Sequence, residues 1–175
     1  METKEIYVQS ALTEKQYRDY MWFHVTGRNR DWLLHLFGAA LVVAFAAANF
    51  HTGSPILGWI FLTLGVYLLL SRYIRFFVSV DRIVKQFGLS AEPKAFYSVR
   101  FTDKGLAVRN DREFAQYSWE QVKKIWFRPR RRIAYVYLTE QNAFLLPYEC
   151  FVSGAPEELR QLAAARLGPG KLAEK

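Results

Sequence analysis

The sequence predicts a membrane protein of the α+β class, in which a two-helix transmembrane hairpin is joined to a cytosolic antiparallel sheet domain with a C-terminal helix. Two observations support this class. No Lys, Arg, Asp or Glu occurs between Trp32 and Ser71, although both flanks are rich in them. From Ala95 onward, the hydrophobic period changes from that of a helix to the alternation of a strand. The 175 residues suffice for one ordinary domain with an accessory element.

The uncharged stretch predicts a transmembrane hairpin over residues 32–77. At about 1.5 Å of rise per residue, a helix over residues 32–50 just crosses a hydrocarbon core about 30 Å thick. A second span is expected over residues 55–75, after a tight loop at residues 51–54. Two buried core helices of a soluble protein are the alternative, but a chain of this size has little material to cover both of them.

The orientation of the hairpin follows from its basic flanks. Arg28 and Arg30 precede the first span, Arg72 and Arg75 lie at the end of the second, and the loop between the spans carries no Lys or Arg. The positive-inside rule therefore places both termini in the cytoplasm. The same four arginines are the predicted anchors at the membrane interface, where a long basic side chain reaches the headgroups.

Small residues recur within both spans. Ala40, Ala44 and Ala48 lie four residues apart, and Gly58 and Gly65 lie seven apart. Because small side chains let helices approach closely in lipid, the two stripes are expected to face each other. Small residues also leave room for helix pairing between chains, so a homo-oligomer stays open.

Polar segments with their own structure are predicted on both sides of the hairpin. Residues 1–31 are expected to form a cytosolic strand and helix, the helix starting at Thr13, where Gln16 completes a capping box. Residues 78–94 are expected to form a juxtamembrane helix and linker, because a helical apolar stripe continues to a stop signal at Gly88.

A sheet domain is predicted over residues 95–168, where six short alternating segments are separated by turns of a few residues. Pro156 and the acidic residues after it predict a closing helix that ends at Gly168. The expected architecture is a partial barrel plugged by this helix. A strand at residues 5–10 could complete the sheet, and residues 169–175 are predicted to be a disordered tail.

One long segment resembles a known family. The stretch FTDKGLAVRNDREFAQYSWEQVKKIWFRPRRRIAYVYLTEQNAFLLPYECF, followed by an amphipathic helix, is similar to the C-terminal domain of YcxB-like bacterial membrane proteins. In that pattern FTDKGL begins the domain, SWEQVKKI lies in its middle and LLPYECF precedes the last helix. The resemblance implies a protein of the bacterial cytoplasmic (inner) membrane with a sheet-and-helix domain, similar in layout to pleckstrin-homology-like membrane proteins. It implies no activity and no catalytic site.

A basic cluster is the candidate site for binding anionic lipid or a partner. It consists of Lys123, Lys124, Arg128, Arg130, Arg131 and Arg132. Its position between two predicted strands makes it a hairpin tip, which could be an ordinary solvated turn. Next to an anionic leaflet, each of these charges would contribute about 1 kcal/mol to binding, and an acidic protein surface is a further possibility. Nucleic acid is not expected, because the alternating aromatic residues nearby suit a sheet core equally well.

The expected function is a membrane-anchored, non-enzymatic interaction module that binds membrane lipids or a protein. The alternative is an enzyme or regulator that acts on a membrane substrate without a recognisable catalytic motif. The three histidines lie outside the predicted sheet domain, and the single cysteine, Cys150, has no partner for a disulfide or thiolate metal site. We therefore expect no catalytic residue, no metal and no cofactor.

Overall fold

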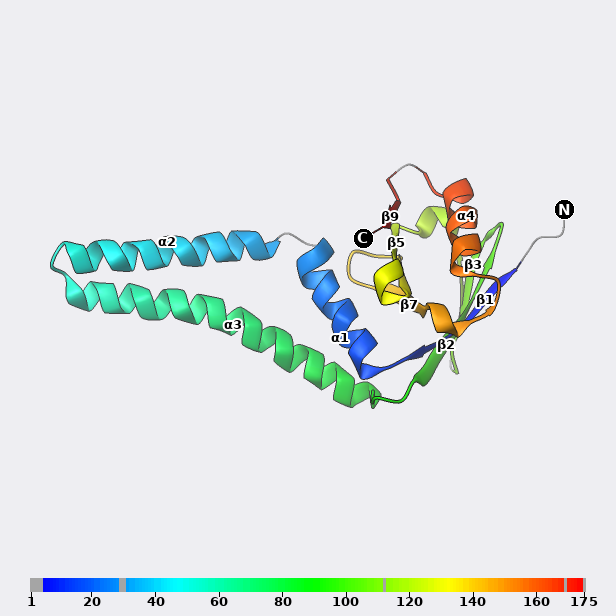
Figure 1. The fold of residues 1–175 in the computed structure, drawn as a ribbon, viewed down its shortest axis with the longest axis horizontal. Coiled ribbons are helices and arrows are strands. Elements are labelled where there is room, and N and C mark those ends of the chain that lie inside the picture. Colours follow the sequence, from blue (N-terminus) through cyan, green and yellow to red (C-terminus); the bar gives the residue numbers. More distant parts are fainter. Residues whose placement is uncertain (1–4, 29–30, 112, 169, 175) are drawn as a thin grey trace. The chain divides into compact units, whose positions relative to one another are not determined.

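The computed structural model describes residues 5–28, 31–111, 113–168 and 170–174. The chain divides into two compact units, a helical unit over Glu14–Leu89 and a sheet unit built from the segments on either side of it, Met1–Thr13 and Ser90–Lys175 (Figure 1). The sheet unit is therefore discontinuous in sequence, and the helical unit is an insertion between its first two strands.

The helical unit contains four helical segments: α1 (Glu14–Trp22), the π-helix η1 (Phe23–Arg28), α2 (Asp31–His51) and α3 (Pro55–Phe87). The helix predicted to start at Thr13 is α1. The stop predicted near Gly88 is also confirmed, because Gly88 has a φ of 58° and its N–H bonds to Lys85. A left-handed residue of this kind is a common end for a helix.

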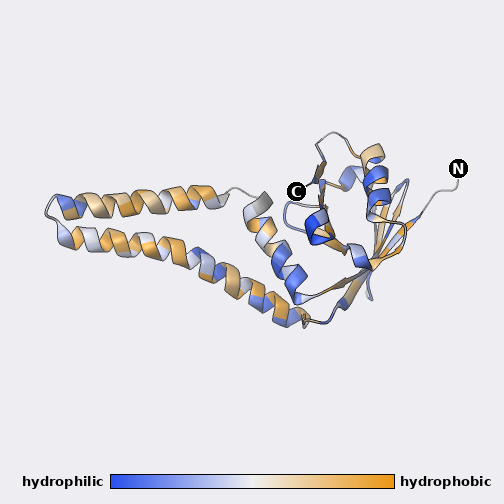
Figure 2. Ribbon diagram, in the orientation of Figure 1, coloured by the Kyte–Doolittle hydropathy of each residue, from blue (hydrophilic) through white to orange (hydrophobic). Residues whose placement is uncertain are grey.

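Two of these helices, α2 and α3, are long and apolar enough to cross a membrane by length and composition. Only 11% of the most apolar window of each helix is buried by protein, whereas a core helix of a soluble protein is mostly buried. Figure 2 shows the hydrophobic residues along both arms of the hairpin. At about 1.5 Å per residue, α3 extends well beyond the 30 Å that a hydrocarbon core requires.

The part of α3 that follows the apolar segment packs against α1. Val80 and Val84 are buried there. Arg18 on α1 donates hydrogen bonds to Glu14 in its own helix and to Asp81 on α3. A guanidinium that binds two carboxylates holds one helix in register against the other.

The contact between α2 and α3 confirms one predicted stripe and corrects the other. Gly58 and Gly65 are buried, as predicted. On α2 the buried small residues are Ala39 and Ala46, which share the seven-residue spacing of the glycines. A four-residue spacing drifts around a helix by about 40° per step, so that stripe turns away from the partner. The alanines predicted to face α3 are accordingly exposed: Ala40, Ala44 and Ala48.

The sheet unit contains two sheets, whereas the sequence predicts one partial barrel. The first sheet has the strand order β4-β3-β2-β1-β8 and the second β7-β6-β5-β9. Strands β2 to β7 are the six predicted ones, and the N-terminal segment joins the first sheet as β1. The first sheet comprises β1 (Ile6–Leu12), β2 (Lys94–Thr102), β3 (Gly105–Arg109), β4 (Phe114–Ser118) and β8 (Phe151–Ser153); the second comprises β5 (Lys124–Arg128), β6 (Ile133–Tyr137), β7 (Ala143–Pro147) and β9 (Leu172–Glu174).

The end of the chain differs from the disordered tail predicted for residues 169–175. Leu172–Glu174 forms β9, which pairs in parallel with β5. The N–H of Ile125 donates to the carbonyl of Lys171 at 2.8 Å, and Glu174 forms an ion pair with Arg160 at 2.8 Å. The physical reason is that an open edge of β5 would expose unpaired backbone groups, which this short strand covers.

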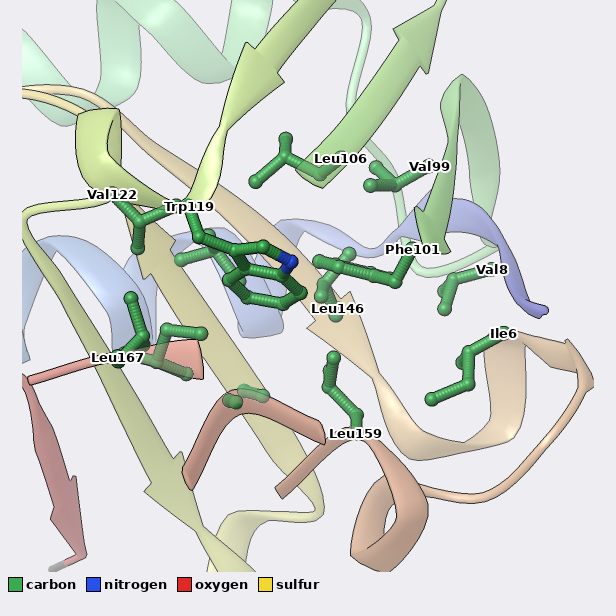
Figure 3. Close-up of a cluster of buried hydrophobic side chains, with 14 of the residues drawn as sticks. Ile6, Val8, Val99, Phe101, Leu106, Trp119, Val122, Leu146, Leu159 and Leu167 are labelled. Atoms are coloured by element: carbon green, nitrogen blue, oxygen red, sulfur yellow. The ribbon is translucent and has the colours of Figure 1, made fainter. Parts of the chain in front are cut away.

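The core of the sheet unit lies between the two sheets and the C-terminal helix α4 (Pro156–Arg166). Leu159, Ala163 and Leu167 contribute to it from α4 and the residue after it, as predicted for the closing helix. Trp119 stacks on Phe101, with ring centroids 6.2 Å apart. Figure 3 shows Phe101 from the first sheet, Leu146 from the second sheet and Leu159 from the helix pointing toward one another.

A polar contact links the two sheets. Ser10 on β1 and Tyr97 on β2 are cross-strand partners. The hydroxyls of Ser10 and Tyr97 donate to the carbonyl of Leu145 on β7, at 2.7 and 3.1 Å, and the Tyr97 hydroxyl accepts the Leu145 N–H at 2.7 Å. Ser10 is fully buried and Leu145 nearly so. Both backbone groups of Leu145 are therefore satisfied by side chains of the other sheet.

We predict that Tyr97→Phe destabilises β7. The buried N–H of Leu145 donates to the Tyr97 hydroxyl, and this is its only acceptor among the described residues. An unsatisfied buried donor costs about 1 to 3 kcal/mol. Hydrogen exchange of the full chain in micelles measures the free energy of opening at Leu145. Tyr117→Phe is the control, since no hydrogen bond of the Tyr117 hydroxyl is seen within the described residues. Equal exchange in both variants would contradict the prediction.

We predict that Gly65→Leu weakens the hairpin, because a Cβ at Gly65 would lie 2.8 Å from Cγ2 of Val43. Overpacking of this kind costs about 1 to 3 kcal/mol. Gly38→Leu is the matched control in α2, where nothing lies within 4 Å of an added Cβ. The midpoint of unfolding in a titration with SDS should fall for Gly65→Leu alone. A similar shift in both variants would show that the glycine contact does not matter.

Candidate functional site

The predicted hairpin tip lies between β5 and β6. The short helical turn η3 (Pro129–Arg131) joins the two strands, and Arg128 pairs with Ile133 at the closing end. Arg132 has a left-handed backbone with a φ of 51°, and its N–H donates to the carbonyl of Pro129 at 3.1 Å. Its own carbonyl accepts the N–H of Tyr148 at 2.9 Å, which attaches the turn to the end of β7.

The structure divides the predicted basic cluster into two groups. Lys124 pairs with Tyr137 at the opposite end of β5, about 13 Å of strand away from Arg128. Its ammonium lies 4.5 Å from the ring centroid of Trp126, and Lys123 is its exposed neighbour. Arg128 is half-buried within the strand. The exposed group, named here the arginine tip, consists of Arg130, Arg131 and Arg132.

The aromatic residues beside the arginine tip belong largely to the interior. Phe127, Tyr135 and Tyr137 are buried, while Trp126 is half-buried. These rings lie on the strands β5 and β6, whereas the exposed arginines lie in the turn η3 and at its end. The three buried rings, Phe127, Tyr135 and Tyr137, are therefore not available as an aromatic surface beside the arginine tip.

Sequence reasoning missed a second basic surface, on the outer face of the first sheet. Val99, Phe101 and Leu106 point into the core, so the alternate residues of β2 and β3 face outward. These residues line a concave surface with a volume of about 970 Å³, named here the outer groove. Its charged side chains are Glu5, Arg100, Lys104 and Arg109. The alternation of Arg100 and Arg109 with apolar residues is the signal that could have found it.

The charges of the outer groove are unevenly matched. Arg100 lies 3.6 Å from the carboxylate of Glu5 and 6.0 Å from the ring centroid of Tyr7. Within the described residues, neither Lys104 nor Arg109 forms an ion pair. The carboxylate next to Lys104, that of Asp103, instead pairs with Arg166 at 2.9 Å. The outer groove thus keeps an excess of positive charge.

The predicted interface anchors lie partly in a small pocket of the helical unit. The pocket has a volume of about 190 Å³, and Arg72 lines it together with His35. Trp22 forms its aromatic wall with Phe76, 5.8 Å away between ring centroids. Arg75 is exposed and lies outside this pocket. Arg30 and the side chain of Arg28 fall outside the described part of the chain.

The described residues include His, Cys, Asp and Glu side chains, which are common metal ligands, and one free thiol. Among them, no group of three or more His, Cys, Asp or Glu side chains could hold a metal ion. Cys150 lies in the turn η4 (Tyr148–Cys150), where its sulfur accepts the N–H of Ala11 at 3.4 Å. Burial raises the pKa of the Cys150 thiol, despite the opposing effect of that hydrogen bond. A thiol that stays protonated is a poor nucleophile.

We predict that Cys150 reacts with iodoacetamide more slowly in the folded chain than in urea. Because the folded pKa is raised, the thiolate appears only at a higher pH than in the unfolded chain. The measurement is the rate of alkylation against pH, which is clean because the chain has one cysteine. A folded-state profile with its midpoint at or below that of the unfolded chain would overturn the prediction.

Comparison with known proteins gives a family match for one part of the chain. A family model described as YcxB-like protein matches residues 101–163, which run from the end of β2 into α4. No curated protein and no solved structure matches the chain. The matched region contains β3 to β8, and therefore both the arginine tip and most of the outer groove. The resemblance predicted from the sequence motifs is thus confirmed, and residues 101–163 are a YcxB-like region.

Proposed function

We propose that this chain is a membrane-anchored, non-enzymatic interaction module of the bacterial cytoplasmic membrane. In this proposal α2 and α3 cross the membrane, both termini lie in the cytoplasm, and the sheet unit is a pleckstrin-homology-like domain. The arginine tip binds anionic lipid headgroups at the inner face, and a protein partner with an acidic surface is the second class of ligand. The observation that supports it best is an exposed triple-arginine turn in a chain with two membrane-capable helices.

The energetics suit a lipid contact. Each basic side chain near an anionic leaflet contributes about 1 kcal/mol, so three exposed arginines contribute about 3 kcal/mol. For a domain already tethered by helices, this shifts the balance between bound and free orientations about a hundredfold. The backbone of the turn is held by the hydrogen bonds of Arg132 to Pro129 and Tyr148, which keeps the three side chains together.

The test compares R130Q/R131Q with the native chain in lipid nanodiscs. Arg132 is kept, because its left-handed backbone would make a substitution there ambiguous. Hydrogen exchange of the turn should be slower in discs with phosphatidylglycerol than in neutral phosphatidylcholine discs. This protection should be lost in R130Q/R131Q, with a loss of about 2 kcal/mol of lipid binding.

The matched control removes two basic residues elsewhere in the same unit. R160Q/R166Q changes exposed arginines of α4 that pair with Glu174 and Asp103, and it should keep the protection of the turn. Equal exchange in neutral and anionic discs would show that the arginine tip is only a solvated turn. A stoichiometric protein that copurifies from native membranes, and is lost in R130Q/R131Q, would assign the tip to a protein contact instead.

A further inference from the structure

The floor of the outer groove is formed by two small residues of β3. Gly105 pairs with Thr102 and Ser118, and Ala107 pairs with Arg100 and Gln116. On this face β3 carries small residues, whereas its neighbours β2 and β4 carry longer side chains on either side of it. The floor cannot gain a side chain at Gly105, because a Cβ there would overlap the backbone oxygen of Tyr117. The result is a trough that runs along β3.

Positive charge lies at both ends of this trough and on one wall. Lys104 precedes Gly105 at one end, and Arg109 closes the other end, about 13 Å of strand away from Gly105. Arg100 stands midway, on the β2 side. Lys104, Arg109 and Arg100 are all exposed. Because the three cations are spread along the trough, they match several negative charges on an extended chain better than one compact phosphate group.

The β4 side of the trough offers apolar and amide contacts. Phe114, which pairs with Arg109, is 63% exposed, so an apolar side chain of a ligand can bury its ring. Gln116 faces the trough next to Ala107, and no hydrogen bond of its amide is seen within the described residues. A side-chain amide both donates and accepts, which suits the peptide groups of an extended segment.

We infer that the outer groove is a docking site for an extended acidic segment of a partner protein. Acidic side chains of the segment pair with Lys104 and Arg109, and Arg100, which lies 3.6 Å from Glu5, adds to the positive charge between them. An apolar residue beside the one that pairs with Arg109 covers Phe114. Charge complementarity selects this occupant, and the volume of about 970 Å³ accommodates several residues. The site shares no residue with the arginine tip, so it adds a ligand to the proposed module without depending on lipid binding.

The experiment selects short random peptides displayed on phage against the full chain in phosphatidylcholine nanodiscs, where no anionic lipid competes. Peptides rich in Asp and Glu should be enriched. The charge-reversal variant K104E/R109E should instead enrich peptides rich in Lys and Arg. Both residues are exposed and form no ion pair within the described residues, so the variant should fold. If Lys104 and Arg109 only supported the fold, K104E/R109E would not change the selected peptides from acidic to basic.

Two further variants separate this site from the arginine tip. Phe114→Ser should weaken the selected acidic peptides at least tenfold, whereas R130Q/R131Q should bind them as the native chain does. Acidic peptides lost in R130Q/R131Q but kept in K104E/R109E would overturn the groove assignment and leave the tip as the anionic site. A selection that does not enrich acidic peptides would also overturn it.

Discussion

The hydrogen bonds between Ser10, Tyr97 and the backbone of Leu145 are the contact on which the two-sheet arrangement depends. Leu145 lies in the second sheet, and both hydroxyls come from adjacent strands of the first. Buried backbone groups are costly to leave unsatisfied, so these hydrogen bonds favour the register that places the two hydroxyls over Leu145. Apolar packing of the core supplies the attraction, and this contact selects the geometry.

The same strand alternation that builds the core also creates the outer groove. Residues such as Val99 and Leu106 point inward, and their neighbours Arg100 and Ala107 point outward. Part of the positive charge of the chain, which has a formal net charge of +8, lies at two places in the sheet unit, the arginine tip and the outer groove. One is a tight turn with three adjacent arginines, and the other is a sheet face with separated cations. Their different spacing is the physical basis for assigning them different ligands.

Local patterns predicted most of the elements, because period and turn residues act over a few positions. The strands β2 to β7, the helix stop at Gly88 and the closing helix are of this kind. The features that could not be predicted depend on contacts between residues that are distant in the sequence. β9 is too short to be recognised without β5, and the face of α2 that meets α3 depends on the position of Gly65. The outer groove requires the register that sets Arg109 beside Phe114, and the length of β5 separates Lys124 from the arginine tip.

The insertion of the helical unit between β1 and β2 has a consequence for the order of folding during synthesis. Ile6 pairs with Phe101, and Leu12 pairs with Lys94, so the partner of β1 is translated only after all of α1, α2 and α3. Until then Ile6 and Val8, which belong to the core, have no sheet to join. The three helices are therefore translated before β1 can pair with β2, and the sheet closes around a strand that was made before all of them.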